Sequence, residues 1–90
     1  MDITIFCDLK KDAGRINELK GIAKRAYFQI YDINNRHMRS RIKKRMYYYA
    51  STILPFVLIN NKENMRGFYS ETGDNAINQL INFISNGNKI

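Results

Sequence analysis

The chain lacks a second cysteine, any tryptophan and any long apolar run, and it has one proline in 90 residues. A lone Cys7 excludes an intramolecular disulfide, and Cys7 and His37 together are too few to ligate zinc. No apolar stretch reaches the roughly 18–20 residues of a membrane span. We therefore expect one domain over residues 1–90, without a metal or a membrane segment, in a reducing and cytoplasmic setting.

Acidic residues are missing between Asp32 and Glu63, although the chain carries a net charge of +7. A dense group of cations with adjoining tyrosines falls inside that stretch: Arg36, Arg39, Arg41, Lys43, Lys44, Arg45, Tyr47 and Tyr48. Such a group attracts phosphates or acidic protein surfaces, and arginine contacts both in a bidentate manner. The competing interpretation is the solvated charged face of an ordinary helix.

Hydropathy patterns predict four strands. Residues 2–7 alternate between apolar and polar faces, and residues 27–33 are aromatic and β-branched. Residues 54–59 form an apolar run headed by the proline, and a last strand is expected over residues 65–70. Asparagines at 60–61 predict a hairpin turn between the last two strands.

Helical spacing predicts three helices between these strands. The first is expected to begin at an Asp12 N-cap, and the second after Asn34 or Asn35. The expected buried positions are Ile16, Leu19, Ile22 or Ala23, and Ala26 in the first helix, Met38, Ile42, Met46 and Tyr49 or Ala50 in the second, and Ile77, Leu80, Ile81 and Ile84 in the third. The order βαβαββα predicts an α/β domain with a four-stranded mixed sheet, the first two strands parallel, and helices on both faces.

The segment from Leu54-Pro55 through the hairpin to the last helix resembles the C-terminal half of a glutaredoxin, a member of the thioredoxin-fold superfamily. The proline before the third strand is cis in that family, so the resemblance predicts a cis peptide bond at Pro55. It also implies the glutaredoxin version of the thioredoxin-like fold for nearly the whole chain. The family's Cys-x-x-Cys motif is absent, since Lys11 and Gly14 stand where its cysteines would lie, and neither residue can attack a disulfide.

The same resemblance implies a glutathione-like site. Leu54-Pro55 resembles the pair whose backbone meets the cysteine of glutathione. Gly67, Ser70 and Glu71 resemble the Gly-Gly-x-Ser-Asp segment that holds the γ-glutamyl end, with one extra residue.

The leading hypothesis is a non-catalytic, glutaredoxin-like binding or adaptor protein, of the kind that a virus or phage with an AT-rich genome would encode. It would use the helix over residues 35–50 to bind an acidic protein surface or nucleic acid, without a cofactor. The alternative is a divergent thiol oxidoreductase that uses Cys7 with glutathione. The alternation of Cys7 with Ile3 and Ile5 favours a position in the core, where a free cysteine behaves as a small apolar residue.

Overall fold

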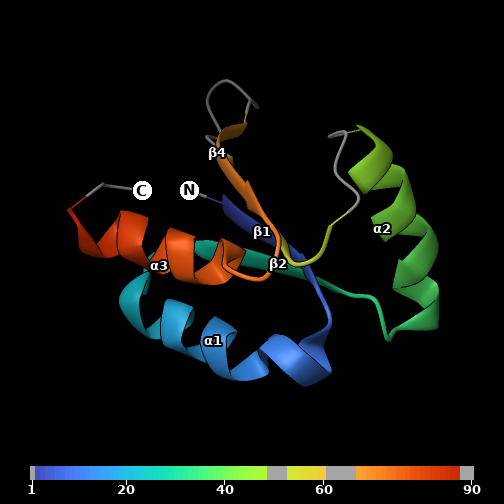
Figure 1. Cartoon of the computed structure of the whole chain (residues 1–90), viewed down its shortest axis with the longest axis horizontal. Coiled ribbons are helices and arrows are strands. Elements are labelled where there is room, and N and C mark those ends of the chain that lie inside the picture. Colours follow the sequence, from blue (N-terminus) through green and yellow to red (C-terminus); the bar gives the residue numbers. More distant parts are fainter. Residues whose placement is uncertain (1, 49–52, 61–66, 88–90) are drawn as a thin grey trace.

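The fold of the computed structural model, which describes residues 2–48, 53–60 and 67–87, is a mixed α/β arrangement (Figure 1). Its elements are β1 (Asp2–Cys7), α1 (Leu9–Ile22), β2 (Tyr27–Asp32), α2 (Arg36–Tyr48), β3 (Phe56–Asn60), β4 (Gly67–Thr72) and α3 (Ala76–Ser85). The strands form one sheet in the order β2-β1-β3-β4, in which β1 and β2 are parallel and the other pairs are antiparallel. The predicted order of elements and the mixed sheet are confirmed, and the arrangement is compatible with a small thioredoxin-like fold.

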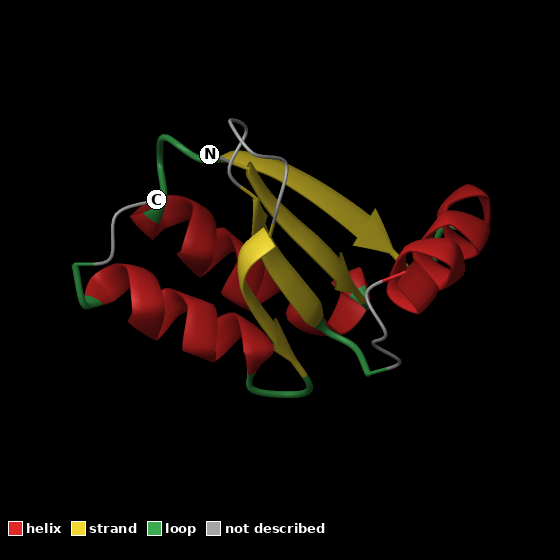
Figure 2. Cartoon of the chain, turned by 90° about the horizontal axis from the view of Figure 1, so that it is seen from above, coloured by secondary structure: helices red, strands yellow, loops and turns green. Residues whose placement is uncertain are grey.

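Helices α1 and α3 cover one face of the sheet (Figure 2). Strand β1 directs Ile3, Ile5 and Cys7 to this face, as its alternation predicted. The helices bury Ile16, Leu19, Ile77 and Leu80 against these residues and against Val57 and Ile59 of β3. Each fully buried aliphatic side chain of this kind contributes roughly 1.5–3 kcal/mol, so this layer is the main core.

Helix α2 packs on the opposite face, which confirms that helices lie on both sides of the sheet (Figure 2). Ile42 is fully buried there with Phe6 and Phe56. The ring of Phe6 stacks on Tyr31 at 5.0 Å and on Phe56 at 5.7 Å between centroids. This second core is small and largely aromatic.

Helix α1 begins one turn earlier than the sequence predicted, so the Asp12 cap is wrong. The N-cap is Asp8, whose carboxylate accepts a hydrogen bond from the Lys10 amide at 3.1 Å. Asp12 already lies inside the helix, because its amide donates to the Asp8 carbonyl at 2.9 Å. The sequence left either Ile22 or Ala23 as a buried position, and the structure buries Ala23 and leaves Ile22 40% exposed.

The Leu54–Pro55 peptide bond is cis, as predicted, and β3 starts directly after it. Strand β4 extends beyond its expected end at residue 70 to Thr72, which pairs with Phe56, and the expected start at residues 65–66 lies outside the described residues. Asn61 of the predicted hairpin turn lies outside the described residues. Over the ranges that the structure describes, no helix is long and apolar enough to cross a membrane.

Candidate functional site

The loops that follow β1 and β2 are joined by a network of carboxylates and amides. One carboxylate oxygen of Asp32 accepts hydrogen bonds from the Leu9 amide at 3.1 Å, the Asn34 amide at 3.1 Å and the Asn34 side chain at 3.0 Å. The Asn34 side chain also donates to Asp8 at 2.6 Å. The bond from Leu9 is the main reason that the pKa of Asp32 is lowered. This network fixes the start of α1 beside the loop that leads into α2.

Cys7 lies at the end of β1, with no exposed surface. Burial, reinforced by the negative charges of Asp12, Asp32 and Asp8, raises the pKa of Cys7 to about 12. A thiol must be exposed and ionised to act as a nucleophile. The geometry therefore does not support thiol chemistry at Cys7 in the folded protein.

Lys11 and Gly14, the two positions that the resemblance aligns with cysteines, are both exposed. The Lys11 ammonium lies 3.5 Å from the Asp74 carboxylate, and both side chains are mostly solvated. Gly14 has open space where a side chain would stand. Within the described ranges, no group of three or more histidine, cysteine or carboxylate side chains is placed to hold a metal ion.

The buried thiol should make stability depend on pH. Because the pKa of Cys7 rises from 9.0 to about 12 on folding, its contribution is intact below about pH 9 and is lost as the pH rises further. We expect a decline of up to about 1.4 kcal/mol per pH unit that Cys7→Ala lacks. Urea denaturation of both proteins between pH 8 and about pH 11 measures this difference, and parallel pH profiles would contradict it.

The structure does not bring the proposed glutathione-like residues together. Leu54 packs beside the aromatic core, whereas Gly67 pairs with Asn60 at the other end of β3. Ser70 and Glu71 are adjacent residues of β4, so their side chains point to opposite faces of the sheet. The antiparallel pairing of β3 with β4 places Gly67 at the end of β3 that lies away from Leu54.

Two residues that the sequence reasoning missed adjoin Pro55 instead. The Gly73 amide donates to the Pro55 carbonyl at 3.0 Å, and the Thr72 hydroxyl donates to the Ile53 carbonyl at 2.6 Å. Gly73 has a φ of +100°, which glycine adopts without strain. Residues 72–74 resemble a helix cap in the sequence, whereas in the structure Thr72 pairs with Phe56 and the N-cap of α3 is Asn75.

Helix α2 is built as the sequence predicted where its side chains are described. The Asn35 side chain caps it by accepting from the His37 amide at 2.9 Å. Ile42 is buried and Met38 is half-buried against the aromatic core. Arg45, Tyr47 and Tyr48 belong to α2, but their side chains, like that of Met46, lie outside the described part of the structure.

The exposed cations of α2 define what we call the α2 basic face: Arg36, Arg39, Arg41, Lys43 and Lys44. The Arg39 side chain donates through Nε to the Ile33 carbonyl at 2.9 Å, which ties the helix to the preceding loop. None of the other four pairs with a carboxylate in the described ranges. Figure 1 shows α2 standing apart from α1 and α3, and all five cations of the face are exposed.

Comparison with known proteins supports the fold alone. No family model and no curated protein matches the chain. A solved structure described as that of a malarial protein is similar over 94% of this chain and 93% of its own, with a TM-score of 0.63 and 15% sequence identity. The whole arrangement of helices and strands is thus shared with a natural protein, while so low an identity carries no function across.

Proposed function

We propose that this chain is a glutaredoxin-like domain without thiol chemistry, which binds nucleic acid through the α2 basic face. The order of elements around the mixed sheet supports the glutaredoxin-like part of the proposal. The buried and protonated Cys7 supports the loss of chemistry. A cytoplasmic location belongs to the same proposal, because reducing compartments preserve a free thiol.

One observation carries the binding function. Arg36, Arg41, Lys43 and Lys44 are exposed on one short helix that contains no acidic residue, and no described carboxylate neutralises them. Unneutralised cations on an open helix create a local positive potential. The phosphate backbone of a nucleic acid is a polyanion that such a potential attracts, and each phosphate neutralised by a cation releases counterions.

The composition of the face favours nucleic acid over an acidic protein. Over residues 36–44 the exposed side chains are cations, His37 and Ser40, while the apolar residues Met38 and Ile42 turn inward. Protein interfaces usually have an apolar centre, whereas backbone contacts to nucleic acid need only cations and polar donors. An acidic protein surface remains the second candidate because the tyrosines at 47–48 could supply an aromatic contact.

A titration tests the proposal. Fluorescence anisotropy should show binding of a labelled single-stranded oligonucleotide and of its duplex, with affinity falling steeply between 50 and 200 mM salt. The triple variant Arg36→Glu, Lys43→Glu, Lys44→Glu should bind at least about 100-fold more weakly. If each substituted cation contacts one phosphate, the salt slope for the single strand should shrink by about 2, at roughly 0.7 per contact.

The matched control is a second triple variant with the same change of charge on another surface of the protein. Arg15→Glu, Lys24→Glu, Arg25→Glu removes as much formal charge from exposed positions in and after α1. We expect its affinity to stay within about threefold of the wild type under the same salt conditions. If both triple variants lose oligonucleotide affinity equally, the net charge of the protein, and not the α2 basic face, explains the binding. Absence of binding at low salt would discard nucleic acid and leave the acidic protein partner.

A further inference from the structure

Strand β2 forms an unprotected edge of the sheet. It pairs with β1 in unbroken register over its six residues, and it contains neither lysine nor proline. The pairing between β3 and β4, at the other edge, has a register shift between Ile59 and Asn60. Natural proteins blunt edge strands with charges, prolines or bulges. The charge of β2 is Asp32 at its end, whose carboxylate three hydrogen bonds already engage, so residues 27–31 carry none of these devices.

The backbone groups that β2 offers can be identified from its ladder. The Ile33 amide donates to the Cys7 carbonyl at 2.8 Å, and Cys7 is in register with Asp32. In a parallel ladder, alternate residues direct both their N–H and C=O groups to the neighbouring strand. The bond from Ile33 shows that the odd-numbered residues of β2 direct these groups to β1. The N–H and C=O groups of Phe28 and Ile30 therefore point outward, and no described residue bonds to them.

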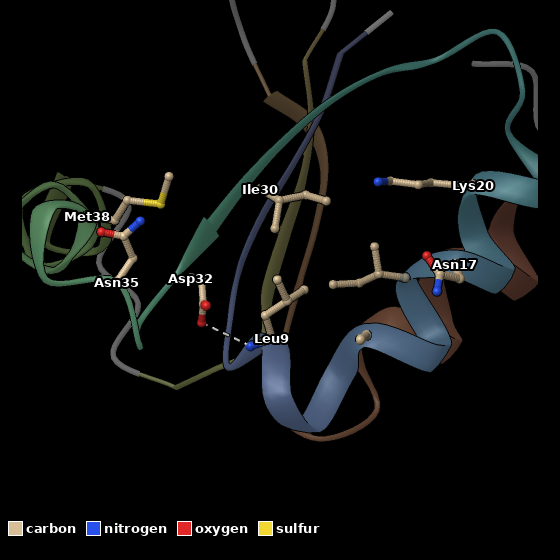
Figure 3. A pocket seen from close by; sticks show the side chains of 9 residues that line it. Leu9, Asn17, Lys20, Ile30, Asp32, Asn35 and Met38 are labelled. Carbon is tan, nitrogen blue, oxygen red and sulfur yellow. Dashed lines mark hydrogen bonds between the residues drawn. The ribbon is translucent and has the colours of Figure 1, made fainter.

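A cavity of about 410 Å³ lies along this edge, and we call it the β2 trough. Its apolar surface comes from Leu9, Ile16 and Ile30, and Met38 closes its α2 end. Figure 3 shows Lys20 and Asn17 on the α1 side and Met38 and Asn35 on the α2 side, with Ile30 of β2 between them. An extended chain laid along β2 would thus place alternate side chains in the trough.

The charges around the trough favour an acidic occupant. The Lys20 ammonium lies 5.9 Å from the centre of the Phe28 ring. Lys10 lies two turns before Asn17, on the same side of α1, and is close enough to help lower the pKa of Asp32. Asp32 is the acid that lines the trough, and three hydrogen bonds already engage its carboxylate.

We propose that the edge of β2 and its trough bind an extended acidic segment of a partner protein by strand addition. The segment's backbone pairs with Phe28 and Ile30, an apolar side chain enters the trough, and a flanking carboxylate meets Lys20. Strand addition supplies affinity through the backbone and selectivity through alternate side-chain pockets. The residues that line the trough do not include any of the α2 basic face, so the test of peptide binding and the test of nucleic-acid binding can give different outcomes.

The probe is a capped seven-residue peptide, Glu-Val-Thr-Ile-Thr-Val-Glu, titrated into the isotope-labelled full chain. NMR should show the largest shifts at the amides of Phe28 and Ile30, with slowed hydrogen exchange at both. A peptide with lysine in place of both glutamates should bind at least about tenfold more weakly, which corresponds to about 1.4 kcal/mol. A peptide with alternate backbone amides methylated, on the edge that would pair with β2, should not bind.

A pair of protein variants completes the test. Lys20→Glu should weaken binding of the acidic peptide at least about tenfold, and Lys24→Glu, at another exposed lysine, should change it less than about twofold. Both variants should bind oligonucleotides alike. The proposal is overturned if the peptide does not bind at millimolar concentration, if the methylated peptide binds as well, or if the shifts lie elsewhere. The proposal is also overturned if sedimentation shows a dimer and the Phe28 and Ile30 amides are protected from hydrogen exchange in it without peptide, because a second copy would then occupy the edge.

Discussion

Replacing Phe6 with alanine is expected to lower the free energy of unfolding by roughly 3–5 kcal/mol, as for other large aromatic residues removed from a core. Phe6 is 1% exposed and stacks on both Tyr31 and Phe56. Its ring therefore joins β1 to β2 and β3 on the face that α2 covers. Since whole domains are stable by only about 5–15 kcal/mol, a large part of the molecules should unfold in mild urea.

Chemical denaturation followed by circular dichroism measures this effect, with Phe28→Ala as the control. Phe28 is the same residue type on the edge strand, but it is only half-buried against the α1 and α3 core. We expect its loss to cost roughly 1–2 kcal/mol, in proportion to the smaller area buried. Similar costs for the two variants would contradict the prediction, because they would show that the fully buried Phe6 contributes no more than the half-buried Phe28.

Patterns that depend on near neighbours were enough to predict the sheet and its helices. Strand β1 was predicted with its bounds because Ile3, Ile5 and Cys7 alternate with residues of the other face. The start of α1 could not be fixed in the same way, because Asp8 and Asp12 are both acceptable caps. The choice of Asp8 rests on Asn34, far away in sequence, which donates to that carboxylate.

The candidate sites also differ in whether the sequence alone reveals them. The α2 basic face was visible in the sequence because a lack of acids needs no knowledge of the fold. The β2 trough was not, because the edge position of β2 follows from the order of all four strands. The glutathione-like residues were grouped by resemblance to a family, and the register of β3 with β4, which the sequence does not show, places Gly67 and Leu54 at opposite ends of β3.

Replacing Ile42 with aspartate is expected to detach α2 and, on the function proposed above, to abolish nucleic-acid binding, while the rest of the domain stays folded. Ile42 is the fully buried anchor of α2, and a charge in its place would lie unpaired beside Phe6 and Phe56. Several kcal/mol of desolvation would oppose that position. The helix has 13 residues, and helices of that length are marginal in water without tertiary contacts.

Hydrogen exchange should show amides of α2 losing protection, while amides of α1, α3 and β1 keep theirs, and oligonucleotide affinity should fall at least as far as in the triple charge variant. The control is Ile22→Asp, the same chemical change at an isoleucine that is 40% exposed at the end of α1. It should leave protection in α2 and binding unchanged, because a carboxylate there remains solvated. If Ile42→Asp binds oligonucleotides like the wild type, the folded α2 basic face is not the binding surface. If it unfolds the whole chain at once, the two cores are one cooperative unit, and α2 is more than an attached binding element.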